Sequence, residues 1–142
     1  MSITIGIAAP EERDAIAALY TSTGYRRGLS DGDEYVVARD GVRVIGVVRK
    51  CSQHGVWVLR GMRVLPEHQR QGIGTRMLRA FVSGLDSTTC YCVPYTHLES
   101  FYAQVGFNRL AESDAPEFLR LRVQRYKQEG ADVVLMSRPH EI

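Results

Sequence analysis

Apolar residues repeat along the chain in two periods, one typical of strands and one typical of helices. Alternation with a period of two occurs in ITIGIAA (3–9), and a long apolar and β-branched run, VWVLRGMRVL, follows at 56–65. Four apolar residues, each four positions after the last, mark one buried face of a helix: Ile73, Met77, Phe81 and Leu85. The pattern predicts a strand near the N-terminus, and a strand followed by a helix in the middle of the chain.

Proline, glycine and acidic residues indicate where the elements begin and turn. Pro10, followed by two glutamates, predicts the start of a helix. Asp40-Gly41 predicts a tight hairpin between two strands within 34–50. Gly61 lies inside a predicted strand, where glycine marks a bulge or the close approach of another group. The first helix is expected to bury Ile16, Leu19 and Tyr20, with loops at 21–24, 25–33 (with room for a short helix) and 51–55.

Shorter elements fill the second half of the chain. We expect strands at 87–93, 107–110 and 132–138, and helices at 97–105 and about 115–128. Gly106 and Gly130 are stop signals for the two helices, and 114–117 resemble a capping box. The order is strand, helix, three strands, helix, strand, helix, strand, helix, strand. This order predicts an α/β or α+β domain with a mixed sheet.

Length and charge limit the class of protein. The 142 residues suit a single domain, 1–142. The net charge of +2, from 18 basic and 16 acidic residues, is too balanced to indicate a nucleic-acid or membrane partner. No apolar run approaches the roughly 20 residues of a membrane span, and the N-terminus lacks the pattern of a signal peptide. We therefore expect a cytoplasmic protein.

The three cysteines do not suggest chemistry of their own. Cys90 and Cys92 alternate on a predicted strand, and Cys51 stands alone. No pair of CxxC motifs is present to build a zinc site. We interpret all three as reduced, buried thiols and expect no metal.

The stretch LPEHQRQGIGTRML (65–78) joins the long strand to the amphipathic helix through two glycines, Gly72 and Gly74. The first amides of a helix lack intrahelical partners, so this position suits an anion such as a pyrophosphate. Gln69, Arg70 and Gln71 add donors, and Arg70 and Arg76 add charge. The Walker and dinucleotide patterns do not fit, because the required lysine and third glycine are missing. An isolated GxG by itself is more typical of a simple turn.

Two motifs together resemble the GNAT acyl-coenzyme A N-acyltransferases. The first, LRGMRVLPEHQRQGIGTRML (59–78), contains V-x-P and then Q-x-x-G-x-G, beginning at Val64 and Gln69. The second is an aromatic pair, a short spacer and Gly-Phe, which here spans 101–107. The element order from 3 to 110 also matches. The resemblance implies a mixed, mostly antiparallel sheet of about seven strands, flanked by helices and splayed between strands four and five.

The resemblance also implies an activity and a site. The activity is transfer of the acetyl group of acetyl-CoA to a primary amine by direct attack in a ternary complex. Tyr102 would protonate the departing thiolate. The backbone of the fourth strand would hold the pantetheine arm, and the glycine loop would hold the pyrophosphate. These cofactor-binding residues are Met62, Arg63, Val64, Gln69, Arg70, Gln71, Gly72, Ile73, Gly74 and Thr75.

The chain departs from the family pattern at two places. The fourth strand carries Arg60, Met62 and Arg63 where many relatives carry a glutamate base. An attacking amine must lose a proton, so other bases are needed. The candidates are Asp33, Glu34, His54 and His97. Tyr95 stands where relatives often have a cofactor-binding asparagine.

Several alternatives stay open from the sequence. A chain that kept the loop and lost the chemistry would be a non-catalytic acyl-coenzyme A-binding sensor or interaction module. The helix at about 115–128 either packs on the sheet, covers the acceptor site or makes a dimer contact. The acceptor is a small-molecule or protein amine. Tyr25, Arg26 and Arg27 lie in the segment that shapes the acceptor pocket in the family.

Overall fold

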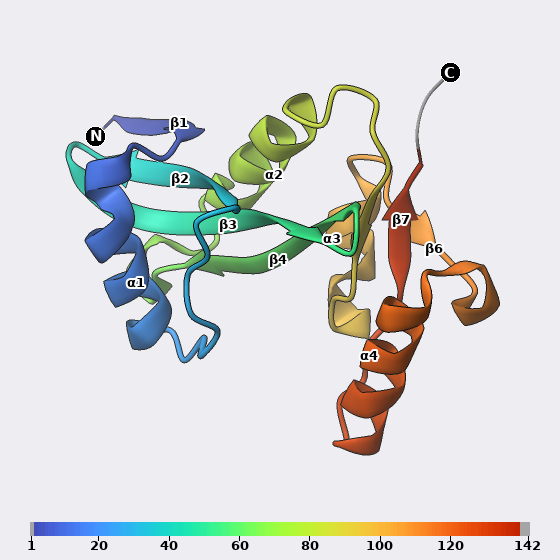
Figure 1. The fold of residues 1–142 in the computed structure, drawn as a ribbon. Helices are drawn as coiled ribbons and strands as arrows, with labels where there is room; N and C mark the ends of the chain where they lie inside the picture. The colour runs from blue at the N-terminus through green and yellow to red at the C-terminus, as the bar shows by residue number, and fades with distance from the viewer. Residues whose placement is uncertain (1, 140–142) are drawn as a thin grey trace. The chain divides into compact units, whose positions relative to one another are not determined.

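The computed structural model describes residues 2–139 and has the predicted order of elements (Figure 1). The strands are β1 (Ile3–Ile7), β2 (Glu34–Asp40), β3 (Arg43–Gln53), β4 (Val56–Val64), β5 (Cys90–Cys92), β6 (Asn108–Arg109) and β7 (Met136–Arg138). The α-helices are α1 (Arg13–Ser22), α2 (Ile73–Ser83), α3 (Glu99–Ala103) and α4 (Glu117–Gln128). Short 3-10 turns are η1 (Pro10–Glu12), η2 (Pro66–His68), η3 (Thr96–Leu98) and η4 (Glu112–Asp114).

The seven described strands form one sheet in the order β1-β2-β3-β4-β5-β7-β6. The β1–β2, β2–β3, β5–β7 and β6–β7 pairs are antiparallel. The β4–β5 pair is parallel, and its register joins Trp57 to Cys90 and Val58 to Tyr91. The expected fold, a mixed and mostly antiparallel sheet of about seven strands with flanking helices, is confirmed.

The contacts divide the chain into two compact units. The first contains the described residues up to Ser52 together with Leu59–Asp86. The second contains Gln53–Val58 and the described residues from Ser87 onward. Strand β4 therefore contributes its first three residues to the second unit and the remainder to the first.

In the first unit, α1 and α2 cover opposite faces of the strands (Figure 1). The predicted inner face of α1, which is Ile16, Leu19 and Tyr20, is buried against Tyr35, Val37, Val44 and Val47. On the other face, a Cβ at Gly46 would lie 3.0 Å from the Cε of Met77 in α2. Neighbouring strand residues point to opposite faces, so Val47 packs toward α1 while Gly46 makes room for α2.

In the second unit, α4 packs through the apolar stripe that the sequence predicts. Leu119 and Val123 are buried, together with Phe107 and Met136. Arg122 of α4 donates to the Oε1 of Gln53 at 2.8 Å. These contacts favour the interpretation of this helix as one packed within its own unit.

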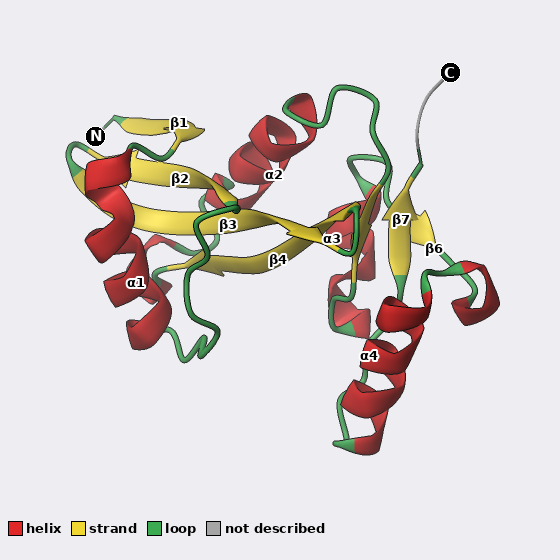
Figure 2. Ribbon diagram, viewed as in Figure 1, coloured by secondary structure: helices red, strands yellow, loops and turns green. Residues whose placement is uncertain are grey.

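Four local expectations need correction. Strand β3 continues to Gln53, because His54 and Gly55 with φ of 50° and 80° suffice for a two-residue hairpin turn. The segment 25–33 contains no helix (Figure 2). The strands expected at 87–93 and 132–138 shorten to β5 and β7. Helix α4 begins without a capping box, since its N-cap is Pro116, which has no side-chain acceptor.

Candidate active site

The predicted glycine loop connects β4 to α2 within the first unit, and its glutamines brace its own backbone. Gln69 donates from Nε2 to the carbonyl oxygen of Val64 at 3.0 Å. Gln71 donates from Nε2 to the carbonyl oxygen of Glu67 at 3.4 Å. The side-chain amides expected as ligand donors are therefore used to fix the loop, which leaves its backbone for a ligand.

Helix α2 begins at an open position. Gly72, its N-cap, has the left-handed φ of 78°, and a Cβ there would meet no atom within 4 Å. No side chain caps the helix, and its first turn holds no acidic residue. By helix geometry the first amides of the helix, which include those of Ile73 and Gly74, have no carbonyl acceptor one turn earlier within the helix. The position therefore fits an anion, as the sequence predicts.

The arginines near the loop have different roles. Arg70 is exposed, and its side chain makes no hydrogen bond or ion pair with another described residue. Arg76 instead donates from Nη2 to the carbonyl oxygen of Ile3 in β1 at 3.0 Å. Arg76 therefore helps to hold β1, and its contribution of charge to the loop stays a prediction. The guanidinium of Arg70 is available to an anion.

The end of β4 carries the three residues predicted to hold the pantetheine arm. Arg63 donates to the carbonyl oxygen of Met62 at 3.0 Å, and its guanidinium lies 5.2 Å from the ring centroid of Tyr25. Val64 accepts the bond from Gln69. Each carbonyl oxygen has two lone pairs, so these bonds do not exhaust the backbone as a binding edge.

Gly61 makes room for a tyrosine. Its φ is 61°, and a Cβ would lie 2.7 Å from the Oη of Tyr20 and 3.0 Å from the ring of Tyr25. The Oη of Tyr20 donates to the carbonyl oxygen of Gly61 at 2.9 Å. Burial raises the pKa of Tyr20 well above its ordinary value, so the phenol stays a donor. The predicted close approach at Gly61 is confirmed.

Tyr102 lies in α3 of the second unit and is only 5% exposed. Its ring contacts Phe101 and Phe107 edge-on, with centroids 5.0 and 6.2 Å away. The residues of the second motif therefore pack together around this tyrosine. Its catalytic role stays a prediction.

The four candidate bases have unequal environments. The carboxylate of Asp33 forms an ion pair with Arg49, and both side chains are buried. Glu34 is exposed at the start of β2. His54 and His97 are also exposed, and each lies against an aromatic ring: His54 is tilted against Phe118 with centroids 4.3 Å apart, and His97 stacks on Tyr95 with centroids 5.8 Å apart. Asp33 is thus engaged in structure, whereas the other three are accessible.

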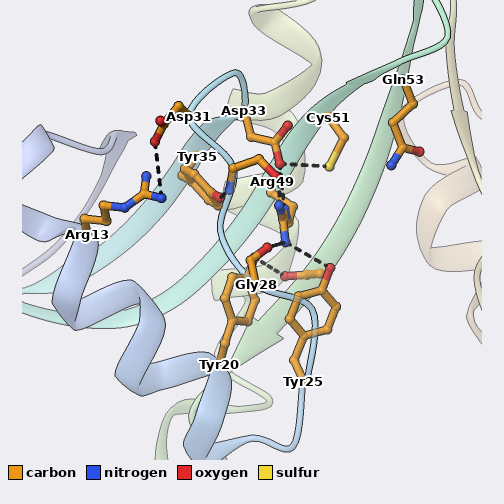
Figure 3. Close-up of polar contacts among 12 residues, drawn as sticks. Arg13, Tyr20, Tyr25, Gly28, Asp31, Asp33, Tyr35, Arg49, Cys51 and Gln53 are labelled. Atoms are coloured by element: carbon orange, nitrogen blue, oxygen red, sulfur yellow. Dashed lines mark hydrogen bonds and ion pairs between the residues drawn. The ribbon is translucent and has the colours of Figure 1, made fainter.

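Arg49, which lies in β3 and is 1% exposed, was not predicted from the sequence as a residue of this region. Burial alone would lower its pKa, but the hydrogen bonds to Asp33 raise it above its ordinary value. Arg49 also donates to the carbonyl oxygen of Gly28 at 3.1 Å and to the Oη of Tyr25 at 3.4 Å (Figure 3). A charged residue within the apolar run VIGVVRK was the available signal.

His68 was also missed. It is 7% exposed at the end of η2, directly before the glycine loop, and its Nδ1 has no hydrogen-bond partner among the described residues. A buried histidine in a loop sequence of mostly exposed residues gives no pattern that periodicity can detect.

All three cysteines are buried and free, as expected. Within residues 2–139, no group of three or more His, Cys, Asp or Glu side chains is arranged to hold a metal ion. Across that same span, no helix has the length and apolar character needed to cross a membrane.

The fold is a mixed α+β sheet with flanking helices, and its fourth strand leads through the glycine loop into the open N-terminus of α2. A family model described as an acetyltransferase (GNAT) domain matches residues 31–109, and the chain therefore belongs to the GNAT acetyltransferases. No curated protein sequence matches the chain significantly.

Solved structures share this fold at low sequence identity. One is N-acetylglutamate synthase from Neisseria gonorrhoeae, complexed with coenzyme A and N-acetyl-glutamate, with a TM-score of 0.71 and 17% identity. The match covers 100% of this chain but only 36% of that chain. An acyl-CoA N-acyltransferase from Pseudomonas aeruginosa has a TM-score of 0.71 at 15% identity, with 96% and 99% covered. The ribosomal-protein-S18-alanine N-acetyltransferase from Escherichia coli has 0.69 at 15%, with 99% and 96% covered.

Proposed function

We propose that the chain is a single-domain N-acetyltransferase, spanning 1–142, which uses acetyl-CoA to acetylate a primary amine. The observation that carries the proposal is the open N-terminus of α2 at Gly72 in a member of the GNAT family. The likeness to an N-acetylglutamate synthase structure that contains coenzyme A supports the choice of cofactor.

The residues around the loop fit the phosphates of such a cofactor. The amide of Gln69 donates to the carbonyl oxygen of Pro66 at 3.3 Å, so the amides proposed for the phosphates are those that follow it in the loop, at the positive end of the α2 dipole. Arg70 adds a guanidinium that has no partner among the described residues. Gly72 leaves space for close approach. When bound, acetyl-CoA supplies an acetyl group on a thioester, which an amine can attack with release of the thiol.

The chain would contribute position and proton transfer. The β4 backbone at Met62, Arg63 and Val64 orients the arm and supplies an amide donor for the carbonyl oxygen. In the overall transfer an N–C bond forms and the C–S bond breaks. The amine loses one proton and the thiolate gains one, for which Tyr102 is the proposed donor.

The amine also needs a proton acceptor. An alkylamine with a pKa near 10.4 is mostly protonated at pH 7, and reaching its neutral form costs about 4.6 kcal/mol. Because Asp33 is held by Arg49, the remaining candidates are Glu34, His54 and His97. The acceptor is a small-molecule or protein amine, as the names of the similar structures suggest for those proteins.

The proposal is tested by titrating the purified chain with acetyl-CoA in a calorimeter, then assaying free thiol release with a panel of amines. We expect micromolar binding and thiol release with at least one amine class. Absence of binding would contradict the anion site. Binding with no release from any amine would favour the sensor instead of the enzyme.

Gly72→Glu provides a sharper test of the loop. A carboxylate there would occupy the positive helix end, so we expect acetyl-CoA affinity to fall by about 30-fold or more. The matched control is Gly72→Ala, which carries the same left-handed strain without the charge. Both variants should melt at similar temperatures. Equal acetyl-CoA affinity in the two variants would show that charge at this position is irrelevant.

A further inference from the structure

A pocket of about 510 Å³ lies at the end of α1 and the loop that follows it. Its lining includes Ala17, Tyr20, Tyr25, Arg26, Arg27 and Leu29. The volume is within the range of small-molecule sites, and the combination of apolar side chains with a few charged groups is typical of them.

The charge of this pocket has one sign. Arg26 and Arg27 are exposed, and neither side chain forms a hydrogen bond or ion pair with another described residue. The acids of the same loop are engaged elsewhere, since Asp31 pairs with Arg13 at 3.4 Å and Asp33 pairs with Arg49. No acidic side chain lines the pocket. Two guanidinium groups are therefore available to bind an anion in this pocket. A carboxylate matches their planar geometry.

Arg49 holds the residues on both sides of these two arginines, one through its side chain and the other through its backbone. Its guanidinium holds the hydroxyl of Tyr25 and the carbonyl oxygen of Gly28 (Figure 3). It also lies 5.9 Å from the ring centroid of Tyr25. A loop without helix or strand is thus anchored at the residues directly before and after the arginine pair. Such anchoring reduces the ordering cost of binding.

The pocket borders the part of β4 to which the proposed function assigns the cofactor arm. Tyr20 and Tyr25 line the pocket and also contact Gly61, which directly precedes Met62. Arg63 lies over the ring of Tyr25. All of these residues belong to the first unit. A molecule in the pocket would therefore lie beside the segment where acyl transfer is proposed.

We propose that the acceptor amine also carries a carboxylate, which Arg26 and Arg27 bind in this pocket. The inference rests on the proposed acetyltransferase function and narrows its substrate class to amino acids and similar molecules. We expect polyamines to be poor acceptors, because two guanidinium groups repel a second ammonium group.

The test compares each of L-leucine, L-methionine and L-glutamate with its α-amide, alongside spermidine, in the thiol-release assay. The amide has the less basic amine and is more often neutral, so intrinsic reactivity favours the amide. We expect at least one acid to be used at least about 10-fold better than its amide, with a lower KM. Equal or better use of every amide, or a preference for spermidine, would overturn the inference and leave the acetyltransferase function intact.

Single variants then locate the effect. Arg26→Gln and Arg27→Gln should each reduce the ratio of acid to amide kcat/KM by about 10-fold or more. Arg79→Gln, which removes an exposed arginine from α2, should leave the ratio unchanged. If Arg26→Gln and Arg27→Gln weaken acetyl-CoA binding and spare the ratio, the arginines serve the cofactor phosphates, which also overturns the inference.

Should no amine be acetylated, calorimetric titration of the three acids decides the matter. Binding that is lost in Arg26→Gln or Arg27→Gln would support the pocket as a carboxylate site. No binding of any acid would overturn it. Acetyl-CoA binding, measured separately in the same preparation, reports on the proposed function alone.

Discussion

At Gly61, strand β4 passes so close to two tyrosines that only a hydrogen fits on its Cα. In Gly61→Ala the new methyl group would collide with the Oη of Tyr20, and the residue would keep a φ of 61°. We expect the free energy of unfolding to fall by about 2–3 kcal/mol, from backbone strain and a disturbed hydrogen bond. Denaturant unfolding measures this change.

Gly41→Ala is the matched control for that substitution. Gly41 has nearly the same φ, 62°, but a Cβ there would meet no atom within 4 Å. Gly41→Ala should therefore lower the free energy of unfolding through backbone strain alone, by about 1 kcal/mol. Equal losses in the two variants would mean that the close approach of Tyr20 has no energetic importance.

Tyr102→Phe removes a hydroxyl from a ring that is packed edge-on between two phenylalanines. If this phenol protonates the leaving thiolate, kcat should fall by about 100-fold, while the affinity for acetyl-CoA changes little. Thiol-release kinetics and calorimetry separate the two effects. Tyr126→Phe removes a phenol hydroxyl elsewhere in the second unit and should leave kcat unchanged. A fully active Tyr102→Phe enzyme would eliminate this residue from the mechanism.

Among the elements, the start of α1 is tied to β2 by one ion pair. Arg39 donates to both carboxylate oxygens of Glu12, at 2.7 and 2.6 Å, and both side chains are less than a quarter exposed. Glu12 also accepts a bond from the amide of Ala9 at 2.8 Å. The bonds to Arg39 lower the pKa of Glu12 below its ordinary value.

This shift predicts a pH-dependent contribution to stability. A carboxylate with a lowered folded-state pKa stabilises the fold fully above its unfolded-state pKa, and the contribution disappears as pH falls through the folded-state value. Glu12→Gln should therefore lower the free energy of unfolding by about 1–2 kcal/mol at pH 7. The difference from the wild type should vanish in acid. Urea unfolding at several pH values measures both effects.

The exposed pair of Arg43 and Glu67, 3.2 Å apart, is the control for that prediction. Water and salt screen such a pair, so Glu67→Gln should have no measurable effect on stability at any pH. A loss for Glu12→Gln that persists unchanged in acid would show that packing, and not charge, ties α1 to β2.

For the whole molecule, long amphipathic elements were predictable and short ones were less so. The periodic stripe of α2 and the Asp40-Gly41 hairpin are each encoded within a few residues. Strands β5 and β7 have only three residues each. The length of such a strand depends on where the neighbouring strands that pair with it end. That information lies elsewhere in the chain, so the sequence predicted strands that were too long.

The site was predictable to a similar degree. The glycine loop could be located, because its bare backbone and the helix after it follow one another in sequence. The contacts of Arg49 could not be predicted, because they join β3 to residues that lie between 16 and 24 positions earlier in the chain. The destination of the Arg76 side chain, the carbonyl oxygen of Ile3, lies 73 positions away. Contacts between residues so distant in sequence arise only when the fold brings them together.

The way Arg49 anchors its loop has an evolutionary consequence. Its bonds go to Tyr25, to the backbone of Gly28 and to Asp33, and none goes to the side chains at positions 26 and 27. Mutations at those two positions can therefore change what the pocket binds while the loop keeps its anchor. A descendant of this chain could acquire a new acceptor through one or two substitutions at these positions, without first evolving a new loop.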